Sequence, residues 1–283
     1  MTSYDKKIIV NADDFGRHPL INRAVARSVE TGLLRSATLM PGGKAFDGAV
    51  EIARAHPALG VGIHLTLVNG FPLCPPEEIP SLVTPEGVFF DDHSVFVRRF
   101  LKGQIAMEDV RRELAAQVEK MMRTGLPVTH IDSHQHMHVL PGIIETALDT
   151  ASAAGIHAVR IPRTPLFAGG SGSFGQLIGR SGLAALAYLA AAKAKRRGFQ
   201  MPDHFEGIVA GEAVSEEYFT HILNHLGTGV TEIMMHPGTD TAVLQKDCAW
   251  QHDFEAELQA ITSRSVMALA ERQHIRPANF RDL

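Results

Sequence analysis

Short apolar runs alternate along this chain with longer segments in which apolar residues recur every three or four positions. The short runs predict β-strands and the longer segments predict amphipathic helices. The predicted strands cover residues 8–12, 37–40, 60–65, 128–132, 158–161, 201–204 and 232–235. The predicted helices cover residues 19–31, 45–55, 108–123, 143–154, 216–226 and 254–273. This alternation is typical of βαβ units built around a mostly parallel sheet.

Two stretches interrupt the alternation. Residues 66–100 are rich in proline and glycine, and residues 165–200 pass from a Gly/Ser-rich run into an apolar segment, 183–192, that ends in a basic cluster. Because no repeat or linker divides the chain, we expect one α/β domain over residues 1–283, a modified (β/α) barrel with insertions at these two places. For segment 183–192 we favour a buried helix with a basic end over a helix lying on an anionic membrane surface.

Composition and charge narrow the function classes. The chain has 283 residues, with 27 Lys and Arg against 31 Asp and Glu. This balance disfavours a general nucleic-acid binder, which needs a basic field. Cys74 and Cys248 are too few for a disulfide scaffold, and we find no signal segment or membrane-spanning run. We therefore expect a cytoplasmic protein without a transmembrane segment. The unusual feature is the 15 histidines, several of them clustered.

Four polar clusters follow predicted strands. They are NADDFG at 11–16, GIHL at 62–65, HIDSHQHMH at 130–138 and MHPG at 235–238. In a parallel barrel the carboxyl ends of the strands surround one mouth. We therefore expect these four clusters to meet in the folded chain.

The residue types in these clusters suit metal-assisted hydrolysis. Asp14, His64 and His134 would offer one carboxylate and two imidazoles from three strands, a set that leaves positions open for water and substrate. Asp13 could accept the proton of a metal-activated water, and His236 could protonate the leaving amine.

Each cluster by itself has a simpler explanation. Adjacent aspartates can cap a helix, a lone histidine on an apolar strand is often hydrogen-bonded in the core, and a histidine run can lie on the surface. His236, before a proline, can simply close a turn. The metal hypothesis depends on all four clusters falling at strand ends.

The clusters at 11–16, 62–65 and 129–138 resemble the signature blocks of the YdjC-like (ChbG-type) carbohydrate deacetylases, and the likeness extends over nearly the whole chain. The resemblance implies a deformed (β/α) TIM-like barrel of the glycoside hydrolase/deacetylase type. It also implies hydrolysis of an N-acetyl group from an amino sugar, giving the free amine and acetate. It implies one divalent ion, Mg or Zn, on Asp14, His64 and His134, with Asp13 as base and His236 as acid. The nearby Asp132, His136 and His138 become substrate-binding or supporting candidates.

A narrower resemblance concerns residues 72–83 and 159–163, which are similar to the hopanoid-biosynthesis-associated HpnK subgroup. This implies an N-acetylglucosaminyl hopanoid glycolipid as substrate, with peripheral membrane contact. Arg160 and Arg163 then become candidates for binding sugar hydroxyls, although surface ion pairs would explain them equally well. Trp250, in a polar segment, is a candidate contact for substrate or for a partner subunit.

Two other functions remain open. One is a second kind of metal hydrolase, such as a phosphoesterase, which would favour two metals and further carboxylates, with Asp132 and Asp240 as candidates. The other is a non-catalytic sugar- or lipid-binding module. As partners we expect a small or lipid-linked N-acetylated sugar and no nucleic acid, and the family likeness suggests a homodimer.

Overall fold

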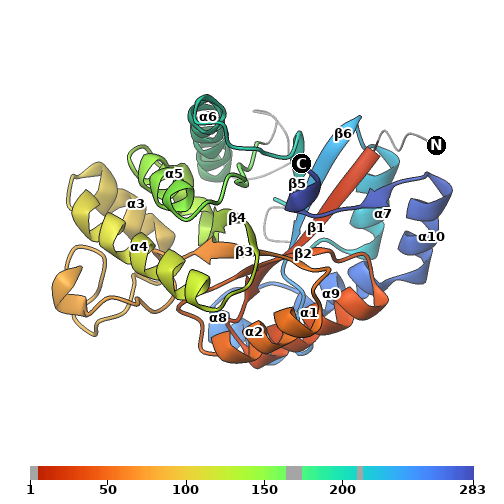
Figure 1. The fold of residues 1–283 in the computed structure, drawn as a ribbon, viewed down its shortest axis with the longest axis horizontal. Helices are drawn as coiled ribbons and strands as arrows, with labels where there is room; N and C mark the ends of the chain where they lie inside the picture. Colours follow the sequence, from red (N-terminus) through yellow and green to blue (C-terminus); the bar gives the residue numbers. More distant parts are fainter. Residues whose placement is uncertain (1–5, 164–173, 209–212) are drawn as a thin grey trace.

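The computed structural model describes residues 6–163, 174–208 and 213–283. In this part of the chain a seven-stranded parallel sheet contains six strands in the order β4-β3-β2-β1-β6-β5, with β7 also paired to β1. Figure 1 labels β1 to β6. The strands are β1 (Lys6–Phe15), β2 (Ser36–Leu39), β3 (Gly60–Leu65), β4 (Val128–Ser133), β5 (His204–Glu206), β6 (Gly229–Met235) and β7 (Arg276–Pro277).

Single-residue bridges continue the sheet from β4 towards β5. Ile131 pairs with Val159 and Ala158 pairs with Gln200, both in parallel, and Gln200 lies four residues before β5. The strands therefore follow one another around a ring, and the expected deformed (β/α) barrel is confirmed.

Two predicted strands were misplaced. Residues 158–161 form only these bridges, because Pro162 has no N–H to extend the ladder and the Arg160 carbonyl is taken by a side chain, His138 Nε2. The strand predicted at 201–204 begins at His204, after Pro202, for the same reason.

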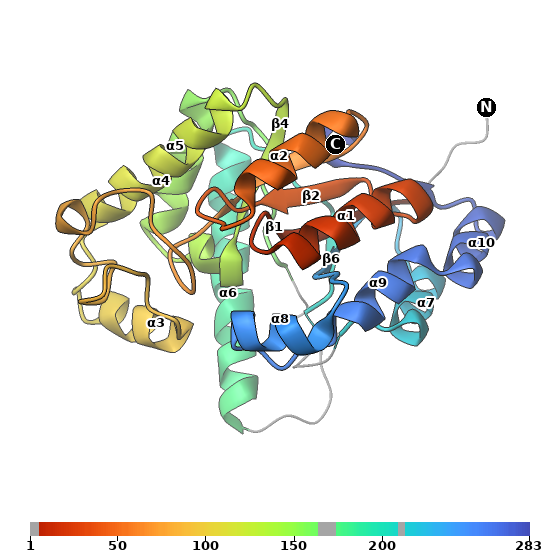
Figure 2. The ribbon, with the colours of Figure 1, turned by 90° about the horizontal axis from the view of Figure 1, so that it is seen from below.

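Helices surround the strands (Figures 1 and 2). They are α1 (Pro19–Thr31), α2 (Phe46–Ala55), α3 (His93–Leu101), α4 (Met107–Arg123), α5 (Ile143–Ala153), α6 (Phe174–Arg196), α7 (Glu216–Asn224), α8 (Thr241–Cys248), α9 (Phe254–Thr262) and α10 (Arg264–Arg272). Three 3₁₀ turns complete the described structure: η1 (Pro76–Glu78), η2 (His134–Val139) and η3 (Phe280–Asp282).

The single long helix predicted at 254–273 was wrong. Ser263 has an extended backbone with ψ 127° and its hydroxyl accepts from the Val266 N–H, so it ends α9 and caps α10. The other predicted helices lie within a few residues of the observed ones. Their apolar stripes face the sheet: on α4, Val110, Leu114, Val118 and Met121 are all buried. Burying one such side chain stabilises the fold by about 1.5–3 kcal/mol.

The two expected insertions differ in structure. Residues 66–100 contain η1 and most of α3, and Phe89 and Phe96 are fully buried there. Of residues 165–200, those up to 173 lie outside the described residues, and α6 follows. Within 184–194, five alanines are buried while Tyr188 and Leu189 are about half exposed, so the helix buries one face. Among the described residues, no helix combines the length and apolar character needed to cross a membrane.

Candidate active site

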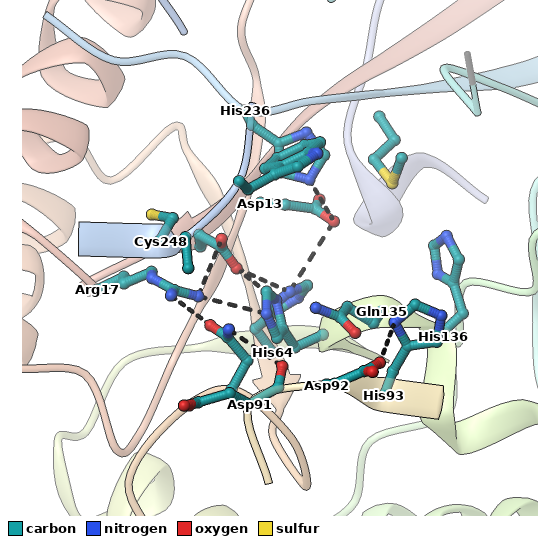
Figure 3. Close-up of a pocket in the computed structure, with 16 residues that line it drawn as sticks. Asp13, Arg17, His64, Asp91, Asp92, His93, Gln135, His136, His236 and Cys248 are labelled. Carbon is teal, nitrogen blue, oxygen red and sulfur yellow. Dashed lines mark hydrogen bonds and ion pairs between the residues drawn. The ribbon is translucent and has the colours of Figure 1, made fainter. Parts of the chain in front are cut away.

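The four polar clusters do meet at the carboxyl ends of the strands. Asp13 and Asp14 come from the end of β1, His64 from β3, His134 from the residue after β4 and His236 from the residue after β6. They line a cavity of ≈ 580 Å³ (Figure 3). The rest of its wall is formed by Arg17, Asn69, Asp91, Asp92, His93, Gln135, His136, Met234, Cys248, Ala249 and Trp250.

A bulge in β1 turns two successive aspartates towards the same cavity. In a regular strand, neighbouring side chains point to opposite faces. Here the register with β2 shifts between Ala12 and Phe15, and Asp14 has a φ of 59°. Bulges of this kind redirect side chains beside active sites. Both Asp13 and Asp14 consequently face His64.

Asp14, His64 and His134, the three predicted metal ligands, do form a group whose ligand atoms all lie within 4.8 Å of one another. Asp14 Oδ1 lies 2.9 Å from His134 Nδ1 and 3.3 Å from His64 Nε2. Within the described residues this buried oxygen accepts no well-aligned hydrogen bond. A buried carboxylate oxygen without such a partner, flanked by two imidazole nitrogens, fits a divalent cation.

Electrostatics keep the carboxylate ionised and one imidazole neutral. Burial opposes ionisation of Asp14, but His134, His64 and Arg17 outweigh it and hold the pKa of the Asp14 carboxyl well below its usual range. Burial lowers the pKa of His134 despite the neighbouring Asp14. A carboxylate and a neutral imidazole are the forms in which these side chains bind metals.

Asp132 orients His64. Its carboxylate lies 2.7 Å from His64 Nδ1, which directs His64 Nε2 towards Asp14. Although burial lowers the pKa of His64, Asp132 and Asp13 raise it to about 10. Such a carboxylate–imidazole pair fixes the ring of a metal-binding histidine. Asp132 is itself fully buried, so its place is behind His64 and away from any substrate.

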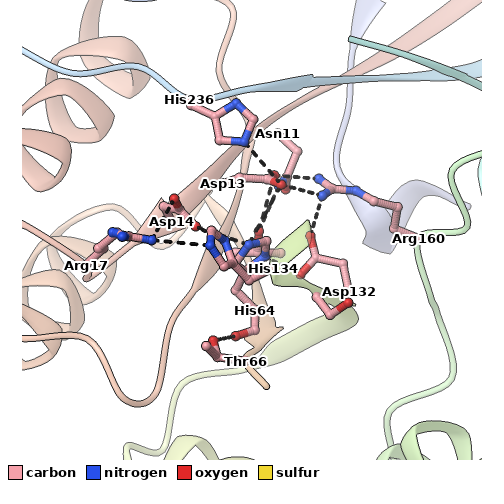
Figure 4. Close-up of polar contacts among 12 residues, drawn as sticks. Asn11, Asp13, Asp14, Arg17, His64, Thr66, Asp132, His134, Arg160 and His236 are labelled. Atoms are coloured by element: carbon pink, nitrogen blue, oxygen red, sulfur yellow. Dashed lines mark hydrogen bonds and ion pairs between the residues drawn. The ribbon is translucent and has the colours of Figure 1, made fainter. Parts of the chain in front are cut away.

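Arg160 lies at the centre of a buried ion network (Figure 4). Its guanidinium donates to both oxygens of Asp13 at 2.6 and 2.7 Å and to Glu232 at 2.7 Å, and it pairs with Asp132 at 2.7 Å. Arg160 has 0% exposure, so it cannot contact a sugar directly as the sequence suggested. Its contacts fix the Asp13 carboxylate in place.

Asp13 is held by this network and stays ionised. Burial raises its pKa, but Arg160 and His64 outweigh burial and lower it. The Asn11 amide donates to Asp13 Oδ1 at 2.8 Å. On the cavity side, Asp13 Oδ2 is 3.9 Å from His236 Nε2 and 4.0 Å from His64 Nε2. Asp13 therefore presents a fixed carboxylate oxygen between two imidazoles.

The remaining predicted site residues differ in their access to the cavity. His136 lines the cavity and has a φ of 58°, and burial lowers its pKa to about 3. His138 lies deeper, between the Ser133 hydroxyl and the Arg160 carbonyl. Arg163 donates to the carbonyls of Pro202 and Asp203 and does not line the cavity. Of these three, His136 is the one placed to meet a substrate.

Several residues at the site were not singled out from the sequence. Arg17 contacts His134 Nε2 at 3.3 Å and Asp14 at 3.7 Å. Glu232, the partner of Arg160, is the one acidic residue in the otherwise apolar end of β6, which is a signal that could have been used. Glu257 accepts from the backbone N–H of His236 and comes from α9, so no local pattern points to it. Trp250, in contrast, was named from the sequence as a candidate contact, and it does line the cavity, with its ring centroid 4.9 Å from that of His236.

The chain is similar over nearly its whole length to one protein family and to carbohydrate deacetylases from several bacteria. The model of the family described as YdjC-like protein matches residues 7–272. A carbohydrate deacetylase from Brevibacillus brevis is 33% identical over 285 residues, covering 98% of this chain and 99% of that protein. Carbohydrate deacetylase 1 from Listeria innocua is 30% identical over 279 residues, covering 98% and 100%.

Solved structures show the same fold. The crystal structure of a candidate cellobiose-phosphate cleavage protein from Enterococcus faecalis is similar with a TM-score of 0.76 and 27% identity, covering 98% of each chain. An uncharacterised protein from Agrobacterium tumefaciens has a TM-score of 0.53 and 10% identity, covering 100% of this chain and 91% of the other, and shows a likeness of fold alone.

Proposed function

This chain belongs to the YdjC-like family, and from that premise we propose that it is a divalent-metal-dependent hydrolase that removes the N-acetyl group of an amino sugar. The observation that carries the proposal is the group Asp14, His64 and His134 beside the fixed carboxylate of Asp13. This arrangement lies in a chain similar over 98% of its length to carbohydrate deacetylases.

Asp14, His64 and His134 would hold the metal. A divalent ion bound there would polarise the acetyl carbonyl and lower the pKa of an attacking water towards ~7. Magnesium and zinc remain the predicted candidates. Asp132 serves this group by fixing the ring of His64.

Asp13 and His236 transfer the proton of the attacking water to the leaving sugar nitrogen. Asp13, ionised and held by Arg160 and Asn11, accepts the proton of the water as the water oxygen bonds to the carbonyl carbon. Burial lowers the pKa of His236, so its ring rests neutral. Asp13 Oδ2 and His236 Nε2 are 3.9 Å apart, which is too far for a direct hydrogen bond, so the proton passes to His236 through one bridging water. His236 then protonates the sugar nitrogen as the C–N bond breaks, leaving acetate and the free amine.

The cavity supports a sugar as the substrate. Its wall combines imidazole, amide and carboxylate side chains with the ring of Trp250, a mixture suited to hydroxyl groups and to the apolar face of a sugar. The lipid-linked N-acetylglucosaminyl substrate, peripheral membrane contact through α6, the homodimer and the cytoplasmic location stay predictions.

The phosphoesterase alternative gains no support. A two-metal site needs carboxylates free to bind the second ion. Asp13, His64 and Asp132 lie close enough to hold an ion, but the Arg160 guanidinium already pairs with both carboxylates and supplies the positive charge between them. Asp240, the other candidate, caps α8 instead.

The test is acetate release by the purified, metal-loaded protein from N-acetylglucosamine, its short oligosaccharides and an N-acetylglucosaminyl lipid. We expect acetate and free amine to appear in equal amounts from at least one of them, and the preferred member distinguishes a free sugar from a lipid-linked one. Binding of these compounds without acetate release would favour the non-catalytic module.

A further inference from the structure

A second group of metal-binding side chains lies directly behind His236. It consists of His236, His252 and Glu257, and we call it the His252 cluster. His236 follows β6, His252 precedes α9 and Glu257 lies within α9. None of the steps proposed above uses His252 or the side chain of Glu257.

The distances in the His252 cluster suit a small cation. His252 Nε2 is 3.3 Å from Glu257 Oε1, His236 Nδ1 is 4.0 Å from Glu257 Oε2, and the candidate ligand atoms all lie within 4.8 Å of one another. Ligand atoms around a tetrahedral zinc ion with bonds of 2.0–2.1 Å lie roughly 3.3 Å apart. The group is therefore close to the size that such an ion requires.

His252 supplies an independent observation, because its hydrogen bonding is incomplete: Nε2 approaches Glu257 Oε1 at 3.3 Å without the alignment of a hydrogen bond, and Nδ1 has no hydrogen-bond partner among the described residues. The His252 side chain is 3% exposed. Its ring is stacked on Trp250 at 4.0 Å and meets the edge of Phe254 at 4.8 Å, so packing fixes its orientation. A buried polar group without a hydrogen bond is unfavourable, and a bound ion would remove this cost.

Glu257 is held in place in the way that metal ligands commonly are. The Val214 N–H donates to Oε1 at 2.9 Å, and the His236 N–H donates to Oε2. These backbone bonds leave the carboxylate further lone pairs, and Glu257 is almost fully buried.

We propose that His236 Nδ1, His252 Nε2 and the Glu257 carboxylate form a second divalent-cation site, of the kind that zinc occupies with two imidazoles, one carboxylate and a fourth open position. This site is separate from the one formed by Asp14, His64 and His134, because the two groups share no residue.

The second site would also set the tautomer of His236. A cation on Nδ1 requires that the ring proton sit on Nε2, and Nε2 is the atom that faces Asp13 at 3.9 Å. With both ring nitrogens occupied, His236 could not first accept a proton from Asp13. It would instead give its own Nε2 proton to the sugar nitrogen, and the proton held by Asp13 would then replace it. Cation binding itself does not depend on the proposed deacetylase activity.

The experiment counts zinc ions per chain at micromolar zinc for the full-length protein and three variants. We expect two ions for the unmodified chain, one for Asp14→Ala, one for His252→Phe and none for the double variant. Cobalt(II) bound to the Asp14→Ala variant should give a visible absorption spectrum. The double variant, which also carries His252→Phe, should lack this spectrum. If His252→Phe retains every ion that the unmodified chain binds, or if Asp14→Ala binds none, the second site is wrong.

The matched control is His130→Phe. His130 is also buried, stacked on an aromatic ring at 3.5 Å and without a partner for Nε2 among the described residues, but it belongs to neither ligand group. It should keep both ions. If His252→Phe does not fold, Glu257→Gln replaces it and should lose the same ion, since a neutral amide binds zinc poorly. A chain that binds two ions but releases no acetate would contradict the proposed function and leave this site intact.

Discussion

Asp14 has a left-handed backbone, with a φ of 59°, which non-glycine residues seldom adopt. Such strain costs of the order of 1 kcal/mol and persists where the surrounding structure holds it. Here the left-handed backbone places the Asp14 carboxylate between His64 and His134, while the Asp13 carboxylate accepts hydrogen bonds from Arg160. Two adjacent residues of the same type therefore have different surroundings and, in our proposal, different roles.

Substitutions at these two aspartates should separate the roles. Asp14→Ala should lose the metal of this site and activity together, because it removes the ligand that both histidines face. Asp13→Asn should keep that metal and lose activity by roughly 10²–10⁴-fold, the usual contribution of a general base. Metal content and acetate release measured on the same samples check both, and an active Asp14→Ala variant would remove the metal assignment.

Glu232 should make stability depend on pH. Burial raises its pKa to about 8, although Arg160 opposes this, against an ordinary value of 4.5. Between these two values the folded chain holds a proton that the unfolded chain releases, so stability should fall as pH rises from about 5 to 8. Glu232→Gln should flatten this fall while keeping an acceptor for Arg160 Nε. Unfolding midpoints of both proteins across this range test it, and parallel curves would contradict it.

The sequence could show which residue types gather at the site, but it could not show how they are held. The predicted site residues lie at the carboxyl ends of strands or directly after them, and a parallel barrel brings strand ends together: they are Asp13, Asp14, His64, His134 and His236. The bulge at Asp14 and the burial of Arg160 arise from tertiary contacts between distant segments. The pattern of apolar and polar residues around either position does not predict such contacts.

At the level of elements, β3 is shaped by a close approach at Gly62. A Cβ built there would lie 2.4 Å from the His130 ring, which cannot retreat because it stacks on Phe280 at 3.5 Å. Gly62 thus lets β4 pack beside the strand that carries His64. The apolar pattern predicted both strands, but it did not reveal this contact.

Two glycine substitutions should therefore have opposite effects. Gly62→Ala should destabilise the protein by about 1–3 kcal/mol through overpacking. Gly48→Ala, within α2, would meet only Asn22 at an ordinary 3.6 Å and should be neutral or stabilise by up to about 1 kcal/mol. Free energies of unfolding from denaturant titration give both values, and equal effects would contradict the close approach.

The last two helices also show that a local sequence pattern can predict a helix without predicting where it ends. The stripe that predicted one helix over 254–273 is real, since both α9 and α10 bury one face. Ser263 divides it because its side chain caps α10 and its backbone is extended. A serine inside a helical pattern is compatible with either outcome, so tertiary packing decides.

At the scale of the whole molecule, the proposed metal ligands join β1, β3 and the residue after β4, and so tie together elements far apart in the sequence. The barrel itself follows from the order of strands and helices, which is why the fold class could be predicted. What varies between related barrels, including the substrate, depends on the segments around the mouth.

Removing metal should therefore lower global stability. A ligand present at 100 times its Kd stabilises the folded state by roughly 2.7 kcal/mol, which is a shift of several degrees in Tm for a chain of this size. Chelation should lower the Tm of the unmodified protein by this order, and by less for Asp14→Ala, which has already lost one site. A Tm that does not respond to chelator would contradict a bound ion at these residues.

Anomalous diffraction from crystals of the metal-loaded protein tests the central claim most directly. We expect a peak within about 2.0–2.2 Å of Asp14 Oδ1, His64 Nε2 and His134 Nδ1. The absence of any peak at these three atoms, in crystals of protein that releases acetate in solution, would contradict it, whether or not a peak lies at the His252 cluster.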